Sequence, residues 1–320
     1  MQLEISWKEC ASLPAAFTRG SATIIKGKVY FGGAVGASNN KDSLFNIYCY
    51  DPLKNLWSVT AQLPVKCFAL SQFKGLLVAL GGIIKDPLMI SNKVYQIDNC
   101  DSKTAAAPWL YDSMHQPRYF ATALSFEHCL VVVGGLSKRN EPLCDVEVFS
   151  SKMNKWSVTK MLNLPFGCSQ LSSVSVDGKH YLLGGKSNNK LLDSVLCTTE
   201  SDILSTLHYV KQGLEATSPW KECDQTPFHS PLAAAVGGHL IAISGTKSPN
   251  EVEGAKYDNG KVFVYSKSQK RWAEMQNYLP IPRLWAATVM ISATEFYVIG
   301  GEGSTEEDLR SVFKGSLNLH

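Results

Sequence analysis

A short apolar run that ends at two glycines recurs along this chain at intervals of about 50 residues. One copy reads HCLVVVGGL, from residue 128 to residue 136. Five copies carry both glycines: Gly32-Gly33, Gly81-Gly82, Gly134-Gly135, Gly184-Gly185 and Gly300-Gly301. A sixth copy is reduced to Ser244-Gly245. Internal repeats of this length are typical of propellers and other repeat arrays, so we expect one structural unit to be used six times.

Tryptophan follows the same period. Six of the seven tryptophans are spaced by roughly 50 residues: Trp7, Trp57, Trp109, Trp156, Trp220 and Trp272. An indole is a large apolar plate, which suits packing between neighbouring units. One tryptophan per unit therefore favours a ring or stack of sheets.

Each unit is expected to contain four short strands. In the first unit these are GSATII, KVYFGG, FNIYCYD and NLWSVT. The strands are apolar along their length rather than alternating, as expected for sheets that are covered on both faces. A glycine after the second strand allows a sharp turn with positive φ where neighbouring units leave little room for a Cβ.

The last unit lacks its tryptophan strand, and the chain begins with a strand around Trp7 that has no partners nearby in sequence. We therefore expect an all-β, six-bladed β-propeller whose N-terminal strand completes the last blade, which removes exposed sheet edges. It is expected to be a single domain over residues 1–320. The blades are placed at about 15–62, 63–113, 114–162, 163–224, 225–278, and 279–320 with 1–14. The additional residues between strands of the fourth unit are expected to form a surface insertion.

The sequence resembles the kelch-repeat family. The motifs that carry this resemblance are YDPLKNLW (50–57), PRYFATALSF (117–126) and LPIPRLWAATV (279–289), together with the double glycines. The resemblance covers essentially the whole chain, although the fifth unit has lost one glycine and an arginine. It implies a propeller that binds other proteins, as a kelch-only protein similar to the kelch domain of BTB-kelch adaptors.

In such domains, arginines before the innermost strands line a basin at one end of the central channel. The resemblance therefore implies that Arg19, Arg118 and Arg283 receive an acidic or polar segment of a partner, since a guanidinium pairs well with carboxylates. Cys67 and Cys168 are assigned to the same ring position, as packed small residues or, alternatively, as redox-sensitive thiols. Loops after the double glycines are expected to add Asn40, Arg139 and Asn189 to the rim, made basic by Lys138, Arg139 and Lys186. Trp285 lies outside the periodic series and is expected either to line the channel or to pack.

Two other functions stay open at this point. A scaffold or actin-associated kelch protein would bind through blade sides or the fourth-unit insertion. A propeller enzyme, such as a sugar mutarotase, would need only a few acid/base groups in the channel mouth. Such groups have no characteristic spacing that a sequence could reveal. The seven histidines show no metal-ligand spacing, so we expect no metal, no cofactor and no catalytic residue.

We expect a monomer in the cytoplasm. A net charge of +3, from 31 basic and 28 acidic residues, gives no reason to expect nucleic acid or a membrane surface as partner. Nine cysteines without CxxC spacing fit a reducing compartment better than a disulfide framework. The first residues show no signal-peptide pattern, and no apolar run is long enough to span a bilayer.

Overall fold

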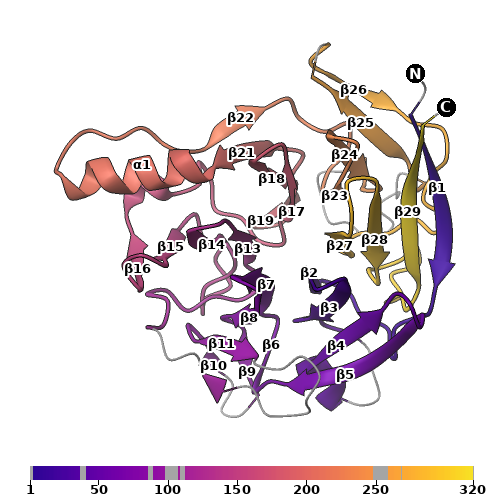
Figure 1. The fold of residues 1–320 in the computed structure, drawn as a ribbon, viewed down its shortest axis with the longest axis horizontal. Helices are drawn as coiled ribbons and strands as arrows, with labels where there is room; N and C mark the ends of the chain where they lie inside the picture. Colours follow the sequence, from indigo (N-terminus) through magenta and orange to yellow (C-terminus); the bar gives the residue numbers. More distant parts are fainter. Residues whose placement is uncertain are drawn as a thin grey trace.

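The computed structural model describes residues 3–36, 41–85, 89–97, 107–108, 112–247, 259–267 and 269–319. Within them the chain forms six four-stranded sheets, which are arranged around a central axis (Figure 1). Every pairing within these sheets is antiparallel. No helix in this part of the chain is long and apolar enough to cross a membrane.

The strands of each sheet are given from the central axis outward. The first sheet contains β2 (Ser21–Ile25), β3 (Lys28–Gly32), β4 (Asn46–Asp51) and β5 (Leu56–Gln62). The second contains β7 (Ala69–Phe73), β8 (Leu76–Leu80), β11 (Val94–Ile97) and β12 (Ala107–Pro108). The third contains β13 (Thr122–Ser125), β14 (Cys129–Val133), β15 (Val146–Ser150) and β16 (Lys155–Val158).

The other three sheets follow the same order. The fourth contains β17 (Ser172–Val176), β18 (Lys179–Leu183), β21 (Val195–Thr199) and β22 (Lys221–Cys223). The fifth contains β23 (Leu232–Val236), β24 (His239–Ile243), β25 (Val262–Ser266) and β26 (Arg271–Glu274). The sixth contains β27 (Ala287–Met290), β28 (Glu295–Ile299), β29 (Val312–Leu319) and β1 (Leu3–Cys10). Small additions are β6 (Val65–Lys66), β9 (Ile83–Ile84), β10 (Met89–Ile90), β19 (Lys186–Ser187), β20 (Lys190–Leu191), and the 3-10 turns η1 (Lys41–Phe45) and η2 (Lys160–Leu162).

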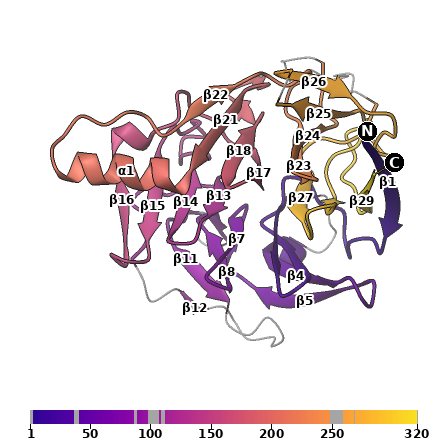
Figure 2. The same ribbon diagram turned by 45° about the horizontal axis from the view of Figure 1, so that its top comes forward.

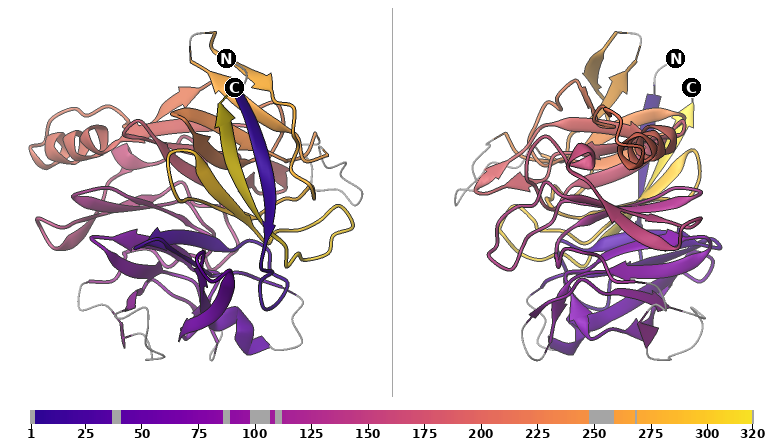
Figure 3. Two further views of the ribbon diagram at one scale, coloured as in Figure 1. Left: turned by 45° about the vertical axis from the view of Figure 1, so that its right-hand side comes forward. Right: turned by 90° about the vertical axis from the view of Figure 1, so that its left-hand side faces the viewer.

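The sixth sheet joins the two ends of the chain. All eight residues of β1 pair with β29, from Leu3 opposite Leu319 to Cys10 opposite Val312. The two strands lie side by side at the outer edge of the molecule (Figure 3). The strand that carries Trp7 is thus the outermost strand of the sheet formed by the C-terminal residues.

The periodic tryptophans connect one sheet to the sheet before it. Four indole N–H groups each donate to a carbonyl in the segment that leaves the preceding sheet. These bonds join Trp57 to Ala11 (2.8 Å), Trp220 to Leu162 (2.6 Å), Trp272 to Asp224 (3.3 Å) and Trp7 to Asn277 (3.2 Å). Trp109 lies outside the described residues. The spacing of tryptophan therefore reflects a contact that recurs between neighbouring sheets.

The double glycines mark close approaches between sheets. At Gly134, φ is +59°, and a Cβ there would lie 2.4 Å from the carbonyl oxygen of Cys168 in the next sheet. That distance is shorter than any ordinary contact, and positive φ adds strain for any residue with a Cβ. Both reasons expected from the sequence, a tight neighbour and a left-handed backbone, hold at this position.

The fourth-unit insertion forms α1 (Glu200–Lys211), the one α-helix of the described residues. It begins directly after β21 and lies on the outside of the molecule (Figure 2). Thr199 caps it by accepting a hydrogen bond from the Asp202 N–H, at 3.1 Å. Ile203 and Leu207 are buried in one core cluster with Leu162 of the third sheet's η2. The insertion is therefore an ordered helix across two sheets, which the sequence analysis did not anticipate.

Candidate binding site at the channel mouth

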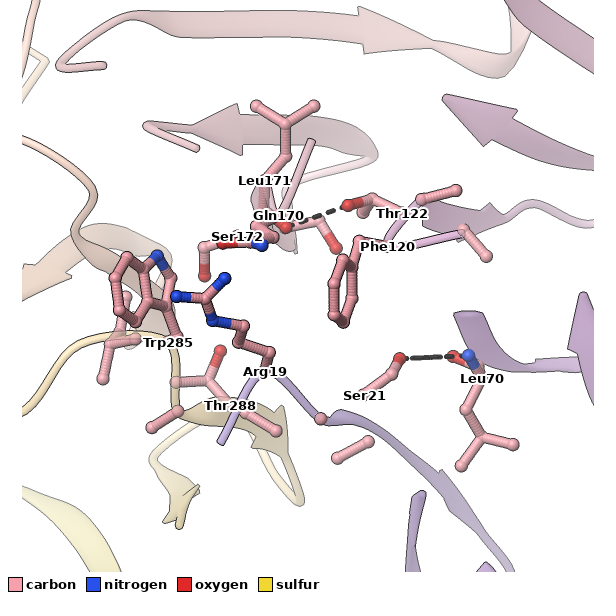
Figure 4. A pocket seen from close by; sticks show the side chains of 18 of the residues that line it. Arg19, Ser21, Leu70, Phe120, Thr122, Gln170, Leu171, Ser172, Trp285 and Thr288 are labelled. Atoms are coloured by element: carbon pink, nitrogen blue, oxygen red, sulfur yellow. Dashed lines mark hydrogen bonds between the residues drawn. The ribbon is translucent and has the colours of Figure 1, made fainter. Parts of the chain in front are cut away.

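Six residues form a ring around one end of the central channel. Each lies two positions before the first residue of an innermost strand. All six have φ between +50° and +59°, although none is glycine. We call them the mouth ring: Arg19, Cys67, Phe120, Gln170, Ser230 and Trp285. A cavity of about 120 Å³ opens between them and is lined by every member except Cys67 (Figure 4).

Backbone hydrogen bonds link members of the mouth ring to one another. The N–H of Arg19 donates to the Trp285 carbonyl (2.8 Å), that of Phe120 to Cys67 (3.0 Å) and that of Gln170 to Phe120 (3.0 Å). Just below, hydroxyl groups join neighbouring innermost strands, as Ser21 does with Leu70 (3.1 Å). The site is therefore held on a scaffold fixed by main-chain contacts rather than on mobile loops.

The charge of the described cavity lining comes from Arg19. Its side chain is partly exposed, and its guanidinium carbon lies 4.0 Å from the centre of the Trp285 ring. Figure 4 shows the two groups facing each other, with Phe120 on another side of the cavity. A cation over an indole is favourable, and it holds the guanidinium in place. The mouth thus presents an oriented cation beside aromatic surface.

Two polar atoms of the mouth ring have no hydrogen-bond partner among the described residues. They are the indole nitrogen of Trp285, whose residue is 7% exposed, and Oε1 of Gln170. One is a donor and the other an acceptor, and both residues line the cavity. Buried polar atoms in native proteins are nearly always paired, so these two atoms are exceptions beside the cavity.

Arg118 does not line the basin, which corrects the sequence-based expectation. Its side chain is 0% exposed and lies inside the third sheet. Nη1 donates to the carbonyls of Gly134 (2.8 Å) and Asp145 (2.9 Å), and Nη2 donates to Oε1 of Glu147 (2.8 Å). Glu147 is equally buried. This guanidinium is therefore a structural group that joins the second-strand turn to the third strand.

Arg283 occupies the same position in the sixth sheet and is also 0% exposed. It donates to the carbonyls of Gly300 (2.8 Å) and Ser311 (3.1 Å) and to the Ser311 hydroxyl (2.9 Å). Burial lowers its pKa to about 10, against the opposing effect of Glu9. The expectation that three arginines share one basin is thus wrong for this residue as well.

The expectation was wrong because it treated two positions of the repeat, two residues apart in the sequence, as one position. Arg118 and Arg283 precede the mouth ring by two positions, whereas Arg19 belongs to it. The equivalent inner positions are all buried: Phe17, Val65, Arg118, Cys168, Phe228 and Arg283. Arginine at the inner position ties a sheet together, and arginine in the mouth ring reaches the cavity.

The two cysteines of interest do not share a ring position. Cys67 belongs to the mouth ring and Cys168 to the inner position, and both thiols are buried. Burial raises the pKa of each thiol to about 12. These are packed, protonated thiols, which is the first of the two readings offered by the sequence.

The rim residues lie apart from the cavity. Arg139 and Asn189 are exposed in the turns after Ser137 and Ser187, and neither lines the cavity, while Asn40 lies outside the described residues. The equivalent loop of the sixth sheet carries acidic residues: Glu302, Glu306, Glu307 and Asp308. The rim therefore has both signs of charge rather than being uniformly basic.

A second cavity, of about 250 Å³, lies further along the channel, toward the other ends of the innermost strands, and shares Ala22, Leu70 and Ala123 with the first. His180 lines it, and burial lowers the pKa of this imidazole to about 4.

Phe120 and Gln170 of the mouth were missed by sequence reasoning. Counting back from the start of each innermost strand, rather than from each arginine, would have found them.

Comparison with known proteins identifies the family. Residues 67–301 match the family model described as the KLHDC2/KLHL20/DRC7 Kelch-repeats domain. Because that match covers well over half of the chain, the protein belongs to the kelch-repeat family, which confirms the resemblance seen in the sequence.

Individual relatives are distant. Kelch repeat and BTB domain-containing protein 1 of vaccinia virus is 23% identical over 84% of this chain and 43% of its own length. Beta-scruin of Limulus polyphemus is 22% identical over 66% of this chain and 24% of its own length. The chain thus spans less than half of the length of these relatives. The solved structure of YjhT superimposes with a TM-score of 0.73 at 15% identity, over 97% of this chain and 99% of that one, which shows a shared fold.

Proposed function

We propose that this chain is a single six-bladed β-propeller, closed by β1 and acting as a non-catalytic protein-interaction module. Its mouth ring receives an acidic or polar segment of a partner protein. The proposal places the protein in the cytoplasm as a monomer, with neither nucleic acid nor membrane as partner. The family relation supports an interaction role, and the mouth geometry supports the place.

The observation that carries the proposal is the grouping of three unlike polar groups in one cavity. Trp285 offers an unpaired indole N–H, Gln170 an unpaired carbonyl oxygen, and Arg19 a cation. A peptide segment has a complement for each: a main-chain carbonyl, a main-chain N–H and a carboxylate side chain. Leaving a buried polar group unpaired costs about 1–3 kcal/mol, which such a segment would recover on binding.

The described lining of the mouth cavity also favours binding over catalysis. It contains Arg19 but neither a carboxylate nor a histidine, so general acid/base chemistry at neutral pH has no obvious group there. In the second cavity, the lowered pKa of His180 keeps its imidazole neutral at pH 7 and weakly basic. These features support the proposal that the partner is bound rather than transformed.

A display library of random peptides tests this proposal. Selection on the wild-type chain is expected to enrich peptides with Asp or Glu, and Arg19→Ala is expected to lose that enrichment. Arg139→Ala is the matched control, because it removes an exposed arginine that lies outside the cavity. Equal enrichment on wild type and Arg19→Ala would contradict the proposed site, and loss on Arg139→Ala alone would move recognition to the rim.

A further inference from the structure

Two cysteines of the fourth sheet lie next to each other on paired strands. The sulfur atoms of Cys197, on β21, and Cys223, on β22, are 3.4 Å apart. Cys197 lies opposite Lys221, and Cys223 lies opposite Val195, so the two thiols are diagonal neighbours on one face of the sheet. A separation of 26 residues that includes a helix concealed this pair from sequence reasoning.

The surroundings of this dithiol differ from those of the other buried thiols. The hydrogen bond from the Cys223 thiol lowers the pKa of Cys197 to about 7, burial opposes this shift, and Lys179 and Lys221 reinforce it. The pKa of Cys223 is raised in turn by the same partner. In contrast, burial raises the pKa of Cys67 and Cys168 to about 12. A thiolate beside a protonated thiol is the arrangement of an attacking and a resolving cysteine.

The two thiols also differ in access. Cys197 is 6% exposed, whereas Cys223 is partly exposed on β22, the outermost strand of its sheet. A disulfide has an S–S length near 2.05 Å, so the sulfurs would need to approach by about 1.4 Å. β22 has only three residues and has a sheet partner on one side only. A strand of this kind can shift more readily than one inside a sheet.

We propose that Cys197 and Cys223 form a redox-sensitive dithiol that a peroxide oxidises to an intramolecular disulfide. The Cys197 thiolate attacks one peroxide oxygen, which breaks the O–O bond and gives a sulfenic acid and hydroxide. The Cys223 thiol then displaces the sulfenic oxygen, which leaves as water once it has taken up protons. Two thiols and one hydrogen peroxide thus give one disulfide and two waters, and two electrons pass from sulfur to oxygen.

Oxidation would act on the junction between the fourth and fifth sheets. The disulfide closes the segment 198–222, which contains α1. Asp224, the next residue after Cys223, accepts a hydrogen bond from the Tyr265 hydroxyl through its carboxylate, and its carbonyl accepts one from the Trp272 indole. The bond would therefore fix both the helical insertion and the contact to the next sheet.

Peptide mapping of the full chain tests this proposal. The reduced protein is treated with hydrogen peroxide, its remaining thiols are alkylated, and a non-reduced digest is analysed by mass spectrometry. We expect a Cys197–Cys223 cross-linked peptide to form before any other cysteine is lost. Formation should be faster at pH 8 than at pH 6, because the attacking thiolate becomes more abundant. Random loss among the nine cysteines, or preferential cross-linking of a different pair, would overturn the proposal.

Two variants separate the roles of the thiols. In Cys223→Ser the sulfenic acid of Cys197 should persist and react with a dimedone probe. In Cys223→Ala, which removes the hydrogen-bond donor that a serine would keep, alkylation of Cys197 at pH 7 should slow by about tenfold. Cys67→Ser, which removes a packed thiol, is the control and should leave the cross-link unchanged. A disulfide from Cys197 to another cysteine in Cys223→Ser, formed as fast as in wild type, would contradict the assignment. The wild-type map decides the outcome even if a variant fails to fold.

Discussion

Arg19 and Arg118 are two arginines from equivalent segments of the repeat that meet opposite environments. Arg118 is sealed inside a sheet, where it satisfies two carbonyls and a carboxylate. Arg19 lies only two positions later in the repeat and reaches a cavity, where an indole supports it. The difference teaches that distance from the innermost strand, rather than residue type, decides whether this segment stabilises the fold or is offered to a ligand.

The largest effect on stability is expected for a substitution of the buried arginine, Arg118. Arg118→Met leaves the Glu147 carboxylate buried without its cation, which should lower the free energy of unfolding by about 3–5 kcal/mol. Urea denaturation measures this change. The double variant Arg118→Met/Glu147→Leu removes both charges but also leaves the His115 and Gln116 N–H groups, which donate to Glu147, without their acceptor. It should therefore recover only part of the loss, and a double variant no more stable than the single one would show that these backbone hydrogen bonds and packing outweigh the ion pair.

His180, a partly exposed residue of the second cavity, extends the comparison to the effect of pH on stability. His180 has a folded pKa of about 4 against 6.5 for the free side chain, so the unfolded chain binds more protons between these values. The contribution of His180 to stability should therefore be constant above about pH 6.5 and fall by about 3 kcal/mol as the pH drops from 6.5 to 4. Denaturation at several pH values measures the slope. His180→Gln should flatten it, and an equally steep slope in that variant would assign the effect to other groups.

Two glycines separate the stability cost of a contact between sheets from the cost of positive φ in an open turn. Gly134→Ala should cost about 2–4 kcal/mol, because a Cβ would collide with the Cys168 carbonyl in addition to the strain of positive φ. Gly178→Ala, with φ of +73° but no atom within 4 Å of the added Cβ, should cost only about 1 kcal/mol. Equal losses in thermal or urea unfolding would mean that the positive φ alone, and not the contact with Cys168, makes glycine necessary at position 134.

The smallest effect on stability is expected at the mouth. Arg19→Ala removes a partly exposed side chain that is stacked on Trp285, so the free energy of unfolding should change by about 0.5 kcal/mol or less. The same urea measurement provides the comparison with Arg118→Met. A loss of several kcal/mol would show that Arg19 is a structural residue like Arg118, and the contrast between them would collapse.

The sequence predicted the repeated features well because they arise from contacts that recur between neighbouring sheets. The strand around Trp7, the apolar second strands and the glycine at 134 all follow from packing between neighbouring sheets. The environments of the Arg118 and Arg283 side chains could not be predicted from the sequence. A shift of two residues along the repeat moves a side chain from the cavity to the interior of a sheet. Trp285 was noticed because it lies outside the tryptophan period, but its unpaired indole nitrogen could not be predicted from the sequence. The Cys197–Cys223 pair depends on the register between β21 and β22, which the repeat spacing does not reveal.

The most direct test of the mouth as a binding site is the indole N–H resonance of Trp285 during titration with an acidic peptide. Trp285→Phe assigns the signal, and the indoles of Trp57 and Trp220, which already donate to carbonyls, serve as internal references. Our account predicts that the Trp285 signal moves with saturation while the two references stay in place. A peptide that binds and shifts other signals, but leaves Trp285 unchanged, would contradict the proposed site.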